Sequence, residues 1–225
     1  MAVSHPLSLS SSALPELGPA DVHALDRLLK ERPIWRGRAP SAPARDGIPT
    51  GFAHLDAVLP GQGWIAAGLN EVLVAGDGVG ELDLLWPMLA QASQEAPVAL
   101  IAPPYMPYAP AWHAAGVRLD RLHLVQAATR DALWAAEQCM RSGACAAVLC
   151  WPPMMADDRP LRRLQVAAES GRCRGVAIRP LQAARNPSPA PLRLVMEAAP
   201  RQIRVLKCRG ANPPTQPVPF PRALQ

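Results

Sequence analysis

The sequence lacks the features that define several protein classes. Its five cysteines form no Cys-x-x-Cys pair, which argues against a zinc ribbon or a disulfide scaffold and favours free thiols in a reducing cytoplasm. No apolar run approaches the roughly 18 residues of a membrane-spanning helix, and the start, MAVSHPLSLSSS, has no basic region typical of a secretion signal. The five histidines show no metal-ligand spacing. We therefore expect a cytoplasmic protein without a metal or cofactor.

Charge is unevenly distributed along the chain. Residues 1–158 hold 10 Lys/Arg and 16 Asp/Glu, whereas residues 159–210 hold 12 Lys/Arg and only two acids, Glu169 and Glu197. A basic half suggests an acidic partner, with nucleic acid as the first candidate. An arginine-rich solvated face explains the same composition equally well, and the sequence does not separate the two.

The pattern of strands and helices predicts an α/β fold. Strand and helix signals alternate for about 130 residues, which is typical of a mostly parallel sheet with helices on both faces, and the last signals indicate an antiparallel C-terminal hairpin. The expected strands are 68–76, 97–103, 121–126, 145–151, 174–180 and two within 191–208, and the expected helices are 80–94, 110–115, 129–143 and 158–170. We expect three parts: a flexible N-terminal arm over 1–46, a core over 47–210 and a proline-rich tail over 211–225.

The N-terminal arm carries an amphipathic helix over about residues 20–32. Its apolar stripe is followed by a short apolar hook and then by a linker rich in Pro, Ala, Gly and Arg. A separate stripe with an aromatic neighbour fits docking onto a partner protein, although the stripe could equally fold back onto its own core. The candidate docking residues are Leu25, Leu28, Leu29, Ile34 and Trp35.

The stretch VAGDGVGEL, residues 74–82, resembles a phosphate-binding loop with altered chemistry. The working motif, G-x-x-x-x-G-K-[ST], places a lysine on the phosphates and a hydroxyl on Mg²⁺. Here the glycines are Gly76, Gly78 and Gly80, but Glu81 and Leu82 occupy the lysine and hydroxyl positions. A carboxylate repels a phosphate that an ammonium would attract, and the unit-charge pair at ~4 Å is worth roughly 4 kcal/mol near a protein surface. The loop therefore predicts a tight strand-to-helix turn rather than a nucleotide site.

The order of elements resembles the core of the RecA recombinase over residues 47–213. The segment TGFAHLDAVLPGQGWIAAGLNEVLVAGDGVGE is similar to the RecA stretch that leads into its phosphate-binding loop. The hook IWRG after an N-terminal helix, together with GLNEVL before the altered loop, resembles more closely the ImuA family of RecA-like proteins, which is encoded with a translesion-synthesis cassette and grouped with the SulA-like division inhibitors.

This resemblance implies a protein that is not an enzyme. Pro104 falls on the position of the RecA catalytic glutamate and Cys150 on that of the Mg²⁺-organising aspartate. The implied role is an accessory function in error-prone translesion synthesis during the SOS response to DNA damage. The implied partners are an ImuB-type polymerase-like protein, RecA and the error-prone polymerase α subunit. A SulA-like inhibitor of FtsZ polymerisation and a residual DNA-dependent ATPase are the alternatives.

The same resemblance places several basic residues where RecA has its DNA-binding loops and closing turn. Both loops look shorter than in RecA. Contact with phosphates needs clustered cations without a particular sequence, and arginine also pairs well with the carboxylates of a protein partner. The candidate residues for DNA or partner contact are Arg159, Arg162, Arg163, Arg179, Arg185, Lys207 and Arg209.

Overall fold

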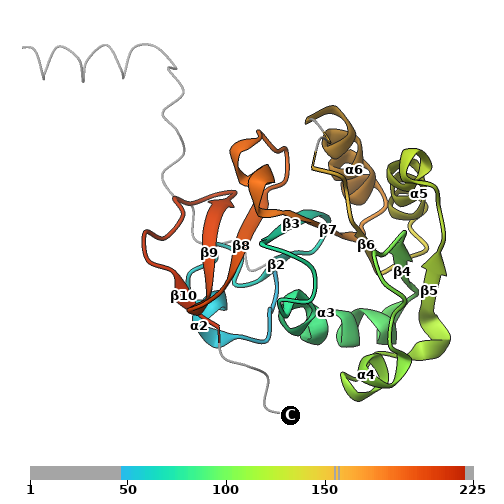
Figure 1. Ribbon diagram of the computed structural model, residues 1–225, viewed down its shortest axis with the longest axis horizontal. Coiled ribbons are helices and arrows are strands. Elements are labelled where there is room, and N and C mark those ends of the chain that lie inside the picture. The colour runs from blue at the N-terminus through green and yellow to red at the C-terminus, as the bar shows by residue number, and fades with distance from the viewer. Residues whose placement is uncertain (1–46, 155, 157, 221–225) are drawn as a thin grey trace, which may run out of the picture. The chain divides into compact units, whose positions relative to one another are not determined.

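The computed structural model describes residues 47–154, 156 and 158–220 (Figure 1). Its helices are α2 (Ala53–Asp56), α3 (Glu81–Glu95), α4 (Ala109–Ala114), α5 (Thr129–Arg141) and α6 (Asp158–Ser170), with 3₁₀ turns η1 (Leu119–Arg121) and η2 (Leu181–Arg185). Its strands are β1 (Gly47–Ile48), β2 (Trp64–Ile65), β3 (Gly68–Val74), β4 (Val98–Ile101), β5 (Leu122–Val125), β6 (Ala147–Cys150), β7 (Arg174–Pro180), β8 (Leu192–Ala198), β9 (Arg201–Cys208) and β10 (Val218–Pro219).

The main sheet is mixed and mostly parallel, which confirms the expected fold class. Its strand order is β10-β9-β8-β3-β7-β6-β4-β5. The six strands from β8 to β5 run parallel, while β8–β9 and β9–β10 pair antiparallel. Parallel strands are covered on both faces and therefore read as nearly continuous apolar runs. The central strand β3, GLNEVLV, is buried at every position.

Helices cover both faces of this sheet, as the sequence predicts (Figure 1). Leu84, Leu85 and Met88 of α3 pack with Val72 of β3 on one face, where α4 joins through an edge-to-face contact between Trp86 and Trp112. On the other face, apolar side chains of α5 and α6 pack against Leu69 and its neighbours. Alternate residues of β3 therefore point into two different cores, because successive side chains of a strand point to opposite faces.

The C-terminal segment contributes more to the fold than its proline content suggests. The sequence predicts a tail from 211 onward, but Val218 and Pro219 form β10 and pair with Ile203 and Gln202 of β9. Proline is tolerated there because β10 is an edge strand, where a missing N–H group costs no ladder bond. Phe220 is 2% exposed, and its ring lies 4.7 Å from that of Phe52. The tail prediction is thus corrected for residues up to 220.

A small antiparallel pair of strands, β1 and β2, precedes the main sheet and was not expected either. Glycines permit this turn: a Cβ at Gly63 would lie 1.9 Å from the Ile48 carbonyl oxygen.

Among the described residues, no helix has the length and apolar character that crossing a bilayer requires.

Candidate functional site

The altered phosphate-binding loop lies between β3 and α3, as expected from its sequence. Gly80 is the residue before the first turn of α3 and has φ 96°, and Gly78 has φ 74°. These left-handed conformations favour glycine. The loop therefore keeps the backbone shape of a strand-to-helix turn at a helix N-terminus, the place where anions are commonly bound.

Glu81, at the position of the missing lysine, turns back into this loop. It is 8% exposed, and its Oε1 accepts a hydrogen bond from the backbone N–H of Gly78 at 3.1 Å. Leu82, at the hydroxyl position, is half-buried and packs against the core beneath α3. The two residues thus provide a buried carboxylate and an apolar contact where a phosphate site needs an ammonium and a hydroxyl.

The other two positions singled out by the resemblance also lie at the carboxyl ends of strands. Cys150 ends β6, is buried, and its thiol lies 3.6 Å from the Val176 carbonyl oxygen. Burial raises the pKa of the Cys150 thiol to about 12, so the group is neutral at pH 7. Pro104 lies in the loop after β4. Within the described part of the chain, no group of three or more His, Cys, Asp or Glu side chains could hold a metal ion.

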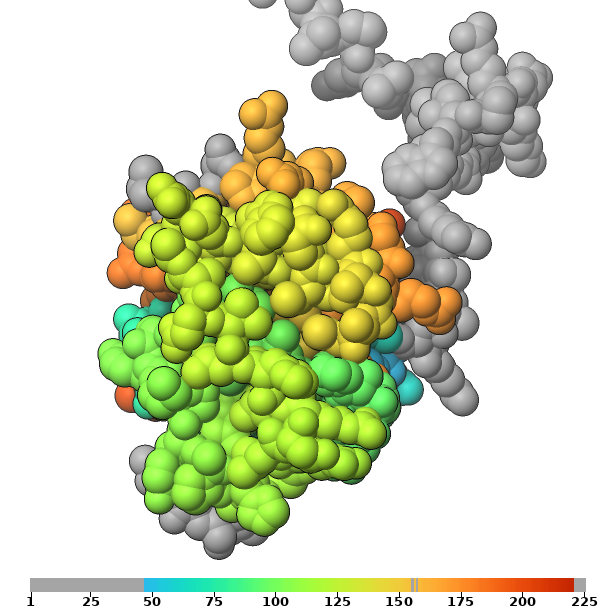
Figure 2. Space-filling model, turned by 90° about the vertical axis from the view of Figure 1, so that its right-hand side faces the viewer, coloured from blue at the N-terminus to red at the C-terminus, as the bar shows by residue number. Residues whose placement is uncertain are grey.

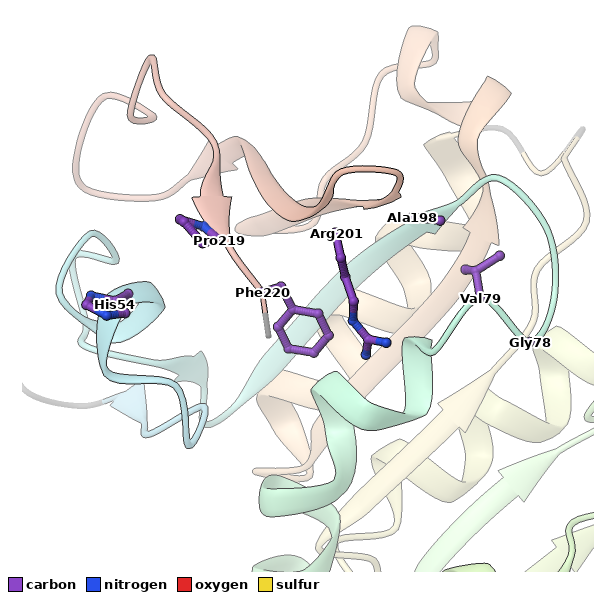
Figure 3. Close-up of a pocket in the computed structure, with 7 residues that line it drawn as sticks. All are labelled: His54, Gly78, Val79, Ala198, Arg201, Pro219 and Phe220. Atoms are coloured by element: carbon purple, nitrogen blue, oxygen red, sulfur yellow. The ribbon is translucent and has the colours of Figure 1, made fainter. Parts of the chain in front are cut away.

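An open cavity of about 830 Å³ adjoins the loop (Figure 3). Its lining is His54, Gly78, Val79, Ala198, Arg201, Pro219 and Phe220. The Arg201 guanidinium crosses from β9, pairs with Asp83 of α3 and lies 4.7 Å over the Phe220 ring. Since this cation is held by a carboxylate and an aromatic face, the cavity wall has a fixed shape with little free positive charge.

A buried ionic cluster lies under the carboxyl edge of the central strands. Glu71 of β3 is 1% exposed and accepts hydrogen bonds from two guanidinium groups, that of Arg179 on β7 at 2.8 Å and that of Arg193 on β8. The two arginine side chains are 0% and 9% exposed. The sheet places Arg193 directly beside Glu71, because these two residues are register partners.

The same cluster donates hydrogen bonds to backbone groups in two segments of the expected contact surface. Arg179 donates to the carbonyl oxygens of Met154 and Ala156 after β6, and Arg193 donates to that of Ala183 in η2. Arg179 is therefore removed from the set of candidate contact residues, because its side chain is inaccessible and serves Glu71 and the loop carbonyls instead.

The remaining basic candidates lie nearer the surface, most of them with partners of their own. Arg162, Arg163 and Arg209 have side chains 70%, 59% and 75% exposed and pair with Asp158, Glu137 and Glu169. Lys207 donates to the Ser188 carbonyl oxygen at 2.8 Å, and burial together with nearby Arg193 lowers its pKa. Arg159 and Arg185 are exposed. These residues lie on α6, η2 and β9, with Arg209 directly after β9, and their contact with DNA or a partner stays a prediction.

The arm residues Leu25, Leu28, Leu29, Ile34 and Trp35 lie outside the described residues, so the docking prediction stays a prediction.

A large exposed apolar surface lies elsewhere, at the β5 edge of the sheet. Tyr105, Met106 and Tyr108 in the loop after β4 are 70%, 73% and 71% exposed. Beside them is a groove of about 220 Å³ lined by Leu100, Met106, Pro107, Ala109, Leu119, Leu122 and Leu124. We call these residues together the β5-edge surface; Figure 2 views the molecule from this side, with α4 and β5 in green below α5 in yellow.

Sequence reasoning missed both the ionic cluster and the β5-edge surface. A signal for the first was present, because a glutamate within a buried central strand requires a cationic partner, and arginines occur in the later strands β7 and β8. A signal for the second was the run Tyr105-Met106-Pro107-Tyr108, which exposes large side chains in a loop where polar residues are usual.

Comparisons with known proteins find a family model and a solved structure that carry the same family name. Residues 69–175 match the family model described as "Cell division inhibitor SulA". No curated protein matches the chain. Among solved structures, the crystal structure of SulA from Pseudomonas aeruginosa is 28% identical over 50% of this chain and 97% of that chain, with a TM-score of 0.43. The family match covers just under half of the chain, so residues 69–175 are similar to that family.

Proposed function

We propose that this protein is a non-catalytic, SulA-type inhibitor that acts by binding another protein, with FtsZ as the target. The family model that matches residues 69–175 carries the name of a cell division inhibitor. At the altered loop, the buried Glu81 carboxylate occupies the lysine position of a phosphate site, which favours protein binding over nucleotide hydrolysis. By the SulA resemblance, FtsZ polymerisation is the step that is blocked.

The observation that carries a binding role is the β5-edge surface. Three large side chains of one loop are each about 70% exposed beside an apolar groove. Contiguous apolar surface of this kind marks interaction sites on soluble proteins, and tyrosine is enriched among the residues that dominate interface energies. Among the described strands, β5 is one of the two edges of the sheet, where outer backbone groups can pair with an added strand.

The test is FtsZ polymerisation with GTP, followed by light scattering, with and without the protein. We expect the unmodified protein to suppress polymerisation in proportion to its concentration. The triple change Tyr105→Ser, Met106→Ser and Tyr108→Ser should reduce potency at least tenfold. Val166→Ser, which removes an apolar side chain 49% exposed on α6, is the matched control and should retain potency. Unhindered polymerisation at excess unmodified protein would contradict the FtsZ assignment.

A second function, accessory to translesion synthesis, is favoured by the part of the chain outside the family match. Most of β7 and all of β8–β10 follow residue 175. Seven of the twelve Lys/Arg of residues 159–210 also lie beyond residue 175, where the resemblance to RecA and ImuA continues. This function predicts capture of an ImuB-type protein, RecA or the error-prone polymerase α subunit.

The two functions separate in one pair of assays. Overproduction of a division inhibitor should give filamentous cells without DNA damage, whereas a translesion accessory protein should leave cell length unchanged and restore damage-induced mutagenesis to a deletion strain.

The role of the N-terminal arm is tested in the capture assay with Trp35→Ala and with a chain that starts at Arg45. Loss of capture at an unchanged melting temperature supports docking through the arm; a large fall in melting temperature opposes it.

A further inference from the structure

The loop of residues 75–80 has the backbone of an anion-binding turn. Its two left-handed glycines precede the first turn of α3, where the free N–H groups and the helix dipole favour negative charge. A Cβ built on Gly76 or on Gly78 meets no atom within 4 Å, so the backbone is bare enough for a ligand to approach closely.

An anion already lies in this turn, and it belongs to the chain itself. Glu81 is more than nine-tenths buried, and its Oε1 accepts the Gly78 N–H. Its Oε2 is also buried and has no hydrogen-bond partner among the described residues. Burying a carboxylate with incomplete partners is costly, so its position requires stabilisation from the backbone of the turn and the positive end of α3.

We propose that the turn of residues 75–80 is a functional anion-binding site whose ligand in this chain is the Glu81 carboxylate, and that removing this side chain uncovers a site for a tetrahedral oxyanion such as inorganic pyrophosphate. The lost phosphate binding then has a specific physical origin: the amide that would hold a phosphate is occupied by an internal anion. The alternative explanation is electrostatic repulsion between the negatively charged loop and the phosphate. Occupancy by Glu81 and repulsion predict different effects of substitutions in the loop.

Three substitutions separate occupancy from repulsion. Glu81→Ala removes both the carboxylate and its charge. Glu81→Gln removes the charge but keeps an oxygen that can accept the Gly78 N–H. Asp77→Asn removes one charge from an exposed residue of the same loop and leaves the contact of Glu81 in place. If the Glu81 carboxylate occupies the site, only Glu81→Ala frees the Gly78 amide for a phosphate.

The experiment is calorimetric titration of the full chain with inorganic pyrophosphate. We expect Glu81→Ala to bind at least tenfold more tightly than the unmodified protein, Glu81→Gln to gain clearly less, and Asp77→Asn to gain nothing. Equal gains for the two Glu81 variants, or equal gains for Asp77→Asn and Glu81→Ala, would show repulsion and overturn the proposal. A Glu81→Ala protein that binds no better than the unmodified one would overturn it as well.

Amide hydrogen exchange tests the proposal in the unmodified protein, even if Glu81→Ala fails to fold. The Gly78 N–H should exchange at least tenfold more slowly than that of Gly76, because Gly78 donates to a buried carboxylate while both residues are otherwise exposed. In Glu81→Gln, Gly78 should keep part of this protection. A Gly78 amide that exchanges as fast as Gly76 in the unmodified protein would overturn the assignment.

Discussion

Neutralising Glu71 should destabilise the protein far more than neutralising a second buried glutamate with the same number of arginine partners. Glu71→Gln leaves the guanidinium groups of Arg179 and Arg193 without their carboxylate in an interior where they are 0% and 9% exposed. Removing one member of a buried ion pair typically costs about 3–5 kcal/mol, because the remaining charge cannot reach water. In a domain of this size, that loss lowers the melting temperature by roughly 10 °C.

Glu137 of α5 provides the comparison, because its own side chain is 5% exposed and pairs with Arg141 and Arg163. Those two arginine side chains are 50% and 59% exposed, so they can turn into water when the carboxylate is lost. Solvent-exposed partners make such pairs weak, and Glu137→Gln should cost about 1 kcal/mol or less.

Urea unfolding of the unmodified protein, Glu71→Gln and Glu137→Gln, followed by tryptophan fluorescence, measures the loss of stability in each variant. Glu71→Gln should lose about 2 kcal/mol or more beyond the loss in Glu137→Gln, with equal dependence of the unfolding free energy on urea. If Glu71→Gln and Glu137→Gln lost the same stability, the exposure of the partner arginines would not be what sets the cost, and the account of the cluster would be refuted.

Three further outcomes are expected. Phe220→Ala should lower the unfolding free energy by about 3 kcal/mol or more, because a ring 2% exposed is removed from the β9–β10 edge; a loss under about 1 kcal/mol would place Phe220 outside the core. Cys150 and Cys173, whose pKa values burial raises to about 12, should resist a thiol reagent at pH 8 in the folded protein and react in urea; fast labelling of the folded state would contradict their burial. Binding to single-stranded DNA should be weak, and replacing Arg185 and Arg209 by Ala should reduce the slope of log affinity against log salt by roughly 1–2; an unchanged slope would exclude contact between these residues and phosphates.

Much of the fold was accessible from the sequence because its signals are local and periodic. The parallel strands are apolar runs bounded by turn residues, and α6 begins and ends at the expected residues, Asp158 and Ser170. The β3–α3 loop can be located from its glycines, because glycine adopts the left-handed backbone conformations that such a turn needs and other residues avoid. Such features depend on a few neighbouring residues, so they can be read without knowing the tertiary structure.

The parts that sequence reasoning missed depend on contacts between distant residues. Arg179 and Arg193 look like surface cations in a basic segment, and only the register of β3 with its two neighbours places them on Glu71. Likewise, the pairing of Val218 with Ile203 makes an edge strand of a segment whose prolines favour an extended tail. In each case the deciding information is which strand lies beside which, and composition does not contain it.

The carboxyl edge of the sheet is organised by the chain's own charges, and this bears on how the protein would work. In open α/β folds, ligands commonly bind at this edge, next to the loops that follow the central strands. Here Glu81 contacts the loop after β3, while Arg179 holds the carbonyl groups of Met154 and Ala156 after β6. Described backbone groups of both loops are therefore held by the chain's own side chains. If the protein inhibits FtsZ as proposed, these internal contacts would take the place of a nucleotide in shaping the loops, and its activity would follow its concentration. Addition of ATP should then change neither its potency against FtsZ nor its melting temperature.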